Sequence, residues 1–359
     1  MTASARARAR LVVLAGSMAA AGALASAQNL PLRDYAPVSM LKVPVHAVPR
    51  AKFPAIDFHN HIDMASPDQL LEMMESANLA TIVNFTGGFG ETLRTQVAKF
   101  APHGDRFLVF ANVDWSQIDR PDFGRWAADE LEAAVKAGAR GLKVFKSLGL
   151  TVKDGAGRLI AVDDPRLDPI WARAGALGIP VAIHTSDPDA FFLPVDRFNE
   201  RYEELQAHPT WSFGGPPFPP KATLLAQRNA IVARHPKTTF VALHVANHPE
   251  DLAEVGRWLD QYPNMQVEIG ARINELGRQP YSARAFFLKY ADRILFGTDS
   301  TPRESTYRTY FRFLETLDEH FDYFTSPTQG RWKIYGIGLP DDVLEKVYRG
   351  NARRVLTRR

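Results

Sequence analysis

Short β-rich runs alternate with amphipathic helical stretches from Phe53 to the C-terminal region, and this alternation limits the possible folds more than any other feature of the chain. The β-rich runs are Phe53–His59, Leu79–Thr86, Arg106–Asp114, Gly141–Ser147, Pro180–Thr185, Thr239–Val245, Met265–Gly270 and Arg293–Thr298. The helical stretches are Asp68–Ala77, Glu91–Phe100, Phe123–Ala137, Leu167–Leu177, Ala222–Arg234, Pro249–Asp260, Ser282–Tyr290 and Ser305–Leu317. Strands that alternate with helices predict a parallel sheet, and eight repeats favour a closed (β/α)₈ barrel.

An open, doubly wound sheet is the alternative arrangement of the same elements. That fold is expected to carry a glycine-rich phosphate-binding turn after its first strand. Here the first strand is followed by His59-Asn-His-Ile-Asp63, which offers no glycine for such a turn. The sequence therefore predicts an α/β protein in which residues 53–359 form a (β/α)₈ TIM barrel.

Residues 1–27 have the pattern of a secretory signal peptide. Three arginines within the first ten residues precede an apolar stretch, Leu11–Leu24, and Ala25–Ala27 is a typical cleavage signal. An uncleaved membrane anchor is the alternative, but the apolar stretch is short and rich in Ala and Gly. We expect cleavage between Ala27 and Gln28, which predicts a periplasmic or secreted protein that is not attached to a membrane.

The basic character of the whole chain comes from this same segment. The chain has 43 Lys and Arg against 40 Asp and Glu, and three of the arginines lie in residues 1–27, which contain no acid, so the remainder is balanced at 40 against 40. A balanced charge gives no reason to expect nucleic-acid binding. The chain has no Cys, so disulfides are excluded and metal ligands are confined to His, Asp, Glu or a modified Lys.

Two segments lie outside the alternation of strands and helices. Residues 28–52 are rich in proline and lack periodicity, which predicts an extended N-terminal arm. Residues 186–221 form a long connection after the fifth strand and are rich in aromatic residues and proline. Connections of this length in a compact domain are usually functional. We expect a lid over the catalytic face, with a plain hydrophobic cover over the strand ends as the alternative.

Residue types that bind metals recur at the C-terminal ends of the predicted strands. His59 and His61 end the first strand, His184 the fifth and His244 the sixth, and Asp299 follows the eighth. Successive side chains of a strand point to opposite faces, so His59 and His61 project together. The active sites of such barrels are built where the strand ends converge. Each residue alone is compatible with a packing or capping role, but together they predict one site.

The ordered set of motifs carries a family resemblance. It consists of Asp57-Phe-His-Asn-His61, His184, His244, Gly297-Thr-Asp299 and the closing Gly350-Asn-Ala352. This set resembles the metal-dependent amidohydrolase superfamily, and most closely its amidohydrolase-related branch of the aminocarboxymuconate-semialdehyde decarboxylase type, over nearly all of the chain after residue 52. The resemblance implies that His59, His61, His184 and Asp299 bind one divalent metal ion, expected to be Zn²⁺, and that His244 lies beside it as a catalytic group.

The resemblance implies a metal-dependent hydrolase with a small-molecule substrate, and the signal-peptide pattern implies that it is exported. A metal-activated water would attack an ester, lactone or amide carbonyl, with Asp299 as proton acceptor and His244 as the group that polarises the carbonyl. A metal-dependent decarboxylase of a small unsaturated or aromatic acid is the first alternative, and it requires cationic side chains that hold a carboxylate. A non-catalytic periplasmic binding protein is the second, but it leaves Asp299 unexplained. The resemblance is also compatible with a homodimer.

Further candidates lie on the fourth, seventh and eighth strands. Lys143 is expected to face the barrel interior, where it either binds a substrate carboxylate or, if carboxylated, bridges a second metal ion; a single ion is favoured. Lys146, on the opposite face, is expected at the surface. Glu268 either orients a ligand histidine or forms an ion pair with Arg272 or Lys143. Arg303, in the loop after the eighth strand, either holds an anionic substrate or lies at the surface.

Overall fold

The computed structural model describes residues 30–31, 34–323 and 329–357. The chain divides into two units, Met1–Val43 and Pro44–Arg359, and the named strands all belong to the second unit. The predicted signal peptide, residues 1–27, lies outside the described residues. Within the described residues, no helix is both long enough and apolar enough to cross a membrane.

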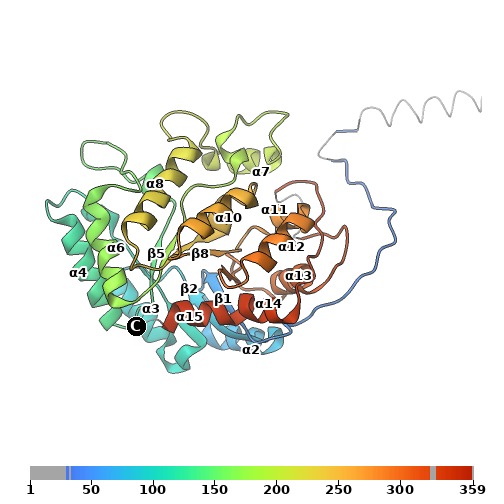
Figure 1. Ribbon diagram of the computed structural model, residues 1–359, viewed down its shortest axis with the longest axis horizontal. Coiled ribbons are helices and arrows are strands. Elements are labelled where there is room, and N and C mark those ends of the chain that lie inside the picture. The colour runs from blue at the N-terminus through green and yellow to red at the C-terminus, as the bar shows by residue number, and fades with distance from the viewer. Residues whose placement is uncertain (1–29, 32–33, 324–328, 358–359) are drawn as a thin grey trace, which may run out of the picture. The chain divides into compact units, whose positions relative to one another are not determined.

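Short parallel strands form the centre of the second unit (Figure 1). They are β1 (Ala55–Asn60), β2 (Leu79–Asn84), β3 (Phe107–Val109), β4 (Ala111–Asn112), β5 (Leu142–Val144), β6 (Val181–Ile183), β7 (Phe240–Ala242), β8 (Met265–Glu268) and β9 (Ile294–Leu295). The strands β1 to β3 pair in chain order, and so do β4 to β9. Only Phe110 separates β3 from β4, so these two are halves of the third predicted strand.

Hydrogen bonds between the first and the last strand segments close the ring. The backbone N–H of Phe58 donates to Phe296 O at 3.0 Å, and the N–H of Asp299 donates to His59 O at 2.8 Å. Asn60 and Ser300 form a parallel bridge just beyond. The strand order therefore returns to β1, and the predicted (β/α)₈ barrel is confirmed.

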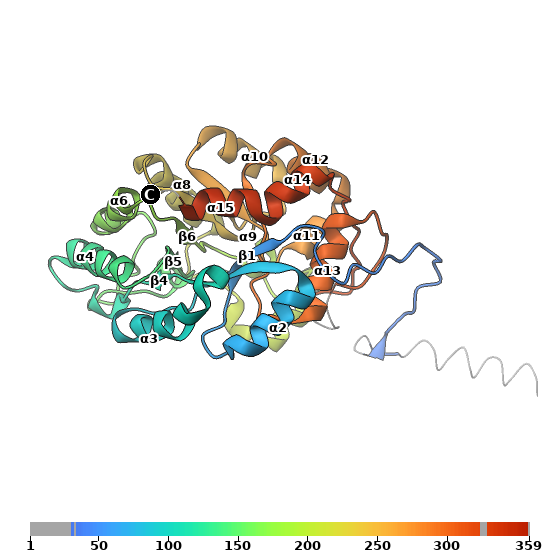
Figure 2. The same cartoon turned by 90° about the horizontal axis from the view of Figure 1, so that it is seen from below.

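The predicted helices lie between the strands in sequence and around them in space (Figure 2). They are α2 (Pro67–Ala77), α3 (Gly90–Phe100), α4 (Phe123–Lys136), α6 (Asp168–Leu177), α8 (Lys221–Arg234), α10 (Leu252–Gln261), α12 (Pro280–Lys289) and α13 (Glu304–Glu315). The helix α10 begins later than predicted because the side chain of Asp251 caps it, accepting from Glu254 N–H at 2.8 Å.

Shorter helical elements fill the connections and the C-terminal segment. They are α5 (Ser147–Leu150), α7 (Tyr202–Ala207), α9 (Leu243–Ala246), α11 (Ile273–Arg278), α14 (Asp341–Glu345), a π-helical turn (Lys346–Gly350) and α15 (Asn351–Thr357). The long connection after β6 contains α7 and supplies part of the wall of the cleft described below, as expected for a lid.

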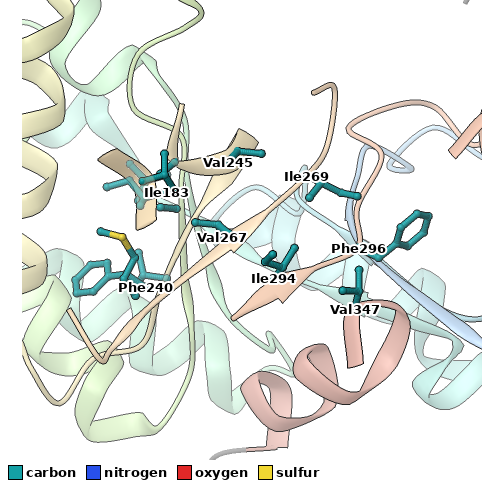
Figure 3. Packing of buried hydrophobic residues seen from close by; sticks show 14 of the residues in the cluster. Ile183, Phe240, Val245, Val267, Ile269, Ile294, Phe296 and Val347 are labelled. Carbon is teal, nitrogen blue, oxygen red and sulfur yellow. The ribbon is translucent and has the colours of Figure 1, made fainter. Parts of the chain in front are cut away.

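Alternate strand residues belong to two different apolar clusters. In β7, Phe240 and Ala242 belong to the large cluster, while Val241 belongs to a smaller one. Figure 3 shows the large cluster, in which Val347 of the π-helical turn lies near Ile294 at the last strand. The smaller cluster also contains Ala352, Val355 and Leu356, so α15 packs against residues from the other face of the strands. Each strand therefore buries both faces, which is typical of parallel barrels.

The buried carboxylate of Asp57 connects β1 to the eighth strand segment. It accepts hydrogen bonds from the N–H (3.1 Å) and hydroxyl (2.7 Å) of Thr298, the hydroxyl of Tyr307 (2.7 Å), the N–H of His59 (3.2 Å) and the amide of Asn60. Burial raises the pKa of Asp57 to about 6, although the hydrogen bonds from Thr298 and Tyr307 oppose this. Asn60 thus belongs to a buried polar network with Asp57, Thr298 and Tyr307.

We predict that Asp57→Asn destabilises the fold. An amide NH₂ cannot accept from Thr298 or Tyr307, so at least one buried donor loses its partner, at a cost of about 2–4 kcal/mol. Urea denaturation of the two proteins measures the difference in the free energy of unfolding. Asp342→Asn, which changes an exposed residue of α14, serves as the control and is expected to stay within about 0.5 kcal/mol of the parent. Equal stability of the Asp57 variant and the parent would contradict the prediction.

Candidate functional site

Three of the predicted metal ligands meet at the C-terminal ends of β1 and β9. The Nε2 atoms of His59 and His61 lie 3.0 and 2.9 Å from Asp299 Oδ1. One ligand atom from each residue lies within 4.8 Å of the other two. His59 is buried, whereas His61 and Asp299 are partly exposed, so the group has one side open to solvent.

Glu268, at the end of β8, orients the ring of His59. Its Oε2 lies 3.0 Å from His59 Nδ1. Because a carboxylate only accepts, the ring donates through Nδ1–H, and Nε2 faces Asp299 Oδ1. When Nε2 is unprotonated, its lone pair and Asp299 Oδ1 would both be available to a cation between them. Two imidazole nitrogens and a carboxylate oxygen form a donor set that fits a divalent ion such as Zn²⁺ or Mn²⁺.

Two glycines make room for the Glu268 carboxylate. A Cβ atom at either Gly270 or Gly297 would overlap with Glu268 Oε1. The N–H of Gly270 also donates to the same oxygen. The Gly297-Thr-Asp299 motif therefore begins with glycine because the eighth strand passes directly against this carboxylate.

The charge balance of the cluster favours an ionised Asp299. Burial alone would raise its pKa, but the charge of His59 and hydrogen bonds from His59 and His61 hold the pKa well below its usual range. An ionised carboxylate is the form that binds a metal.

His184 and His244 form a second pair next to the cluster. His244 Nδ1–H donates to Gly270 O at 2.8 Å, so its Nε2 is an acceptor, and this atom lies 3.2 Å from His184 Nδ1 and 3.8 Å from Asp299 Oδ2. His184 Nε2 lies 3.0 Å from Ser186 O. Among the described residues, the structure therefore places His184 beside the three-residue cluster and turned toward His244 and Ser186, outside the group of atoms that lie within 4.8 Å of one another.

Both imidazoles of this pair are neutral at ordinary pH. Burial lowers the pKa of His184 to about 4, against the hydrogen bond and charge of Asp187, which raise it. Burial and the charges of His184 and Arg272 hold the pKa of His244 well below its usual range. With Nδ1–H donating to Gly270 O, a neutral His244 presents the lone pair of Nε2 to His184 and Asp299. The predicted role of His244 in polarising a carbonyl stays a prediction.

Lys143 lies inside the barrel beside the cluster. Its Nζ is 3.2 Å from His59 Nε2 and lies over the rings of Phe85 and Phe145 at 4.7 and 5.1 Å. Burial lowers the pKa of Lys143 to about 7, although the charges of Asp299 and Glu268 oppose this. The structure thus places Lys143 against His59 and not in the wall of the cleft.

A cleft of about 700 Å³, counted with its part open to solvent, lies next to the cluster. Its wall is formed by Lys146, His184, Asp187, Pro188, Phe191, Arg201, Glu204, Trp211, His244, Ala271, Arg272, Asp299 and Gln329. The long connection after β6 supplies several of these residues, including Phe191 and Trp211. The cavity volume without the part open to solvent is about 290 Å³, which is at the lower end of the range of small-molecule sites.

Lys146, Asp187 and Arg272 lie near one another in the wall and are among its charged residues that were not predicted as site residues. Lys146 Nζ lies 2.6 Å from Asp187 Oδ2, and Arg272 Nη2 lies 4.0 Å from Asp187 Oδ1. Lys146 is therefore directed to the cleft and is not the surface residue that the sequence suggested. Burial would raise the pKa of Asp187, but the hydrogen bond from His184 and the charge of Lys146 lower it to about 2. Their positions in the sequence could have indicated them, because all three closely follow the C-terminal ends of strands, where the active sites of such barrels lie.

The guanidinium of Arg272 has hydrogen-bonding capacity that its described partners do not use. Its side chain is 6% exposed; Nη1 donates to Ala271 O at 2.7 Å, and Nε has no partner among the described residues. Arg201 also has an Nε without a partner among the described residues, but its two other guanidinium nitrogens are paired with Glu204 at 2.9 Å and with Glu275. Arg303 is exposed at the start of α13 and does not line the cleft.

The comparisons with known proteins agree with this architecture. The amidohydrolase family model, of the amidohydrolase-2 group, matches residues 42–358. The chain belongs to this family, whose members are metal-dependent enzymes that include hydrolases and decarboxylases. A search of curated proteins found no match.

Several solved structures share the fold. A 2,6-dihydroxybenzoate decarboxylase from Rhizobium is 18% identical, with a TM-score of 0.51 and coverage of 85% of this chain and 98% of its own. A dihydroxybenzoic acid decarboxylase from Polaromonas sp. JS666, solved with manganese and the inhibitor 2-nitroresorcinol, is 17% identical, with a TM-score of 0.53 and coverages of 85% and 97%. An uncharacterised TIM-barrel protein from Bordetella bronchiseptica is 17% identical, with a TM-score of 0.53 and coverages of 85% and 99%. Identities this low establish the fold alone.

We predict that Glu268→Gln weakens metal binding by 10- to 100-fold, because the neutral amide no longer fixes the tautomer and basicity of His59. Competition with a chelator of known affinity measures the dissociation constant. Glu254→Gln is the matched control: Glu254 Oε2 lies 3.3 Å from Nε2 of His248, a histidine outside the cleft wall. Equal metal affinity of the Glu268 and Glu254 variants would contradict the prediction.

Proposed function

We propose that this chain is an exported, metal-dependent hydrolase that cleaves an ester, lactone or amide bond in a small molecule carrying a carboxylate. The observation that carries the hydrolytic assignment is the pair of proton acceptors at the cleft, Asp299 Oδ2 and His244 Nε2, which lie 3.8 Å apart. Hydrolysis requires removal of a proton from water, whereas decarboxylation requires a donor that protonates carbon. Export is proposed from the signal-peptide pattern of residues 1–27, and this proposal is independent of the proposed reaction.

Each residue has a role that follows from its contacts. His59, His61 and Asp299 would hold one divalent ion, proposed as Zn²⁺, and His184 is proposed as the fourth ligand. The bound ion supplies Lewis acidity and lowers the pKa of water. Asp299 would help to hold the ion through its carboxylate and would accept a proton from water at Oδ2. His244 accepts a proton at Nε2.

The substrate class follows from the cations of the wall. The ammonium of Lys146 lies 2.6 Å from Asp187 Oδ2 and the guanidinium of Arg272 lies 4.0 Å from Asp187 Oδ1, and Arg272 Nε has no partner among the described residues. A carboxylate is the group that such donors bind most strongly. Phe191 and Trp211 supply apolar surface that covers the substrate and excludes water.

A decarboxylase is the second candidate, because these same cations meet the requirement for holding a carboxylic acid. Two of the three fold neighbours named above are decarboxylases, one of 2,6-dihydroxybenzoate and one of dihydroxybenzoic acid. The two candidates differ in product: hydrolysis gives a new acid and an alcohol or amine, and decarboxylation gives carbon dioxide. A panel of lactones, amides and aromatic acids with both products measured separates them.

We predict that removal of the metal with a chelator abolishes turnover and that Zn²⁺ restores it, with one ion per chain by elemental analysis. Asp299→Asn lowers kcat at least about 100-fold, because the amide cannot accept the proton of water. Asp342→Asn is the control and retains full turnover.

Two results would contradict these proposals. Full turnover by metal-free protein would exclude the metal-dependent mechanism. Two ions per chain, together with a mass increase of one carboxyl group on Lys143, would replace the single-metal proposal by a bridged pair.

We also predict that Arg272→Met raises KM about 10- to 100-fold for a substrate with a carboxylate, since the variant loses one charge-assisted hydrogen bond of about 1.5–3 kcal/mol. The same change leaves KM for the neutral amide analogue of that substrate within about twofold. Arg303→Met, at the exposed start of α13, is the control and alters neither value. An equal effect of Arg272→Met on charged and neutral substrates would contradict carboxylate binding.

A further inference from the structure

The backbone that carries His244 has an unusual conformation. His244, Val245, Ala246 and Asn247 have φ values of 58°, 55°, 56° and 53°. A left-handed conformation costs about 1–2 kcal/mol for each residue that is not glycine, and Val is among the least suited to it. The other non-glycine residues with positive φ in the described part of the chain are separated from one another in sequence. We call His244–Asn247 the left-handed turn; its geometry requires contacts that hold it.

Arg228 of α8 supplies one such contact from within the protein. Its guanidinium is fully buried, and Nη1 donates to Ala246 O at the centre of the left-handed turn. Nε and Nη2 both donate to Asn229 Oδ1, at 3.1 and 2.8 Å, and the group lies 4.7 Å from the ring of Trp258. Within the described residues, no carboxylate forms an ion pair with it. A buried cation without a carboxylate is costly, so its retention indicates a specific role.

The side chain of Asn247 connects the same turn to the loop that carries His184. Its Oδ1 accepts from Thr185 N–H at 3.1 Å, and its Nδ2 donates to Ser186 O at 3.1 Å. Ser186 O is also 3.0 Å from His184 Nε2. The position of the turn therefore affects both imidazoles of the second pair. Movement of Ala246 would be transmitted to His244 directly and to His184 through Asn247.

We propose that Arg228 is a positioning residue, which fixes the left-handed turn through Ala246 O and thereby holds His244 Nε2 toward Asp299. It touches neither the metal ligands nor the cleft wall, so it acts only through the backbone. The effect of Arg228 on turnover depends on the role of His244 in the proposed function. The effect of Arg228 on the position and tautomer of the His244 ring does not depend on that role. Measuring the ring therefore tests the inference separately from the proposed function.

The test compares Arg228→Met and Arg228→Lys with the same changes at Arg293. Arg293 is a matched control because it also donates to backbone carbonyls, those of Leu259, Tyr262 and Met265, but near the N-terminal ends of β8 and β9. The mature, metal-free protein is labelled with ¹⁵N-histidine, and the imidazole signals of His244 are assigned by their loss in His244→Gln. Far-UV circular dichroism and thermal melts establish that each variant is folded.

In the parent we expect His244 to show a single neutral form with the proton on Nδ1. In Arg228→Met we expect this signal to shift or split into two tautomers, with the parent spectrum largely restored in Arg228→Lys, whose ammonium can reach Ala246 O. Both Arg293 variants are expected to keep the parent signal. With a substrate from the panel, Arg228→Met lowers kcat at least about tenfold while KM stays within about twofold.

An unchanged His244 signal in folded Arg228→Met overturns the inference, whatever the substrate proves to be. If Arg228→Met does not fold, the comparison of Arg228→Lys with Arg293→Lys decides: a His244 signal identical in both to that of the parent likewise overturns it. An altered His244 signal with no hydrolysable substrate found supports the inference and counts against the proposed function alone.

Discussion

The hydrogen bonds that Asp57 accepts from Thr298, together with the backbone bonds from Phe58 and Asp299, join the first strand to the last, and the site depends on this closure. His59 and His61 lie at the end of the first strand, and Asp299 follows the last strand. They can share one ion only if these two strands stay in register. A buried carboxylate with several donors fixes that register more firmly than backbone pairing alone, because each donor left without a partner carries a penalty.

The charged residues near the closure form two arrangements, one at the metal cluster and one at the cleft wall. Glu268 fixes the tautomer of His59 and leaves its Nε2 facing Asp299, so the protein presents acceptor atoms to a point where a cation fits. On the cleft side, Asp187 neutralises part of the positive charge of Lys146 and Arg272 without occupying every donor of Arg272. The first arrangement suits a metal and the second suits an anionic substrate. Both are achieved in a partly buried cleft where such interactions are stronger than in water.

Sequence patterns predicted the barrel, its strands and the inward direction of Lys143, because alternation and helical periodicity are local properties. They placed Lys146 at the surface, although it lies against Asp187 in the cleft. The error has a physical cause: where a side chain past the end of a strand points is set by the loops that fold over it, here the connection that carries Trp211. Arg272 was considered only as an ion-pair partner for Glu268 for the same reason.

The sequence by itself determined which residue types stand at the strand ends, and hence the candidate ligands His59, His61, His184 and Asp299 and the class of fold that gathers them. Only the tertiary structure decided that three of these converge while His184 turns to His244, and that a left-handed turn fixes the direction of His244. A residue's place on a strand follows from local periodicity. The rotamer and tautomer of its ring follow from partners distant in sequence, such as Glu268, Gly270 and Arg228, which no local pattern specifies.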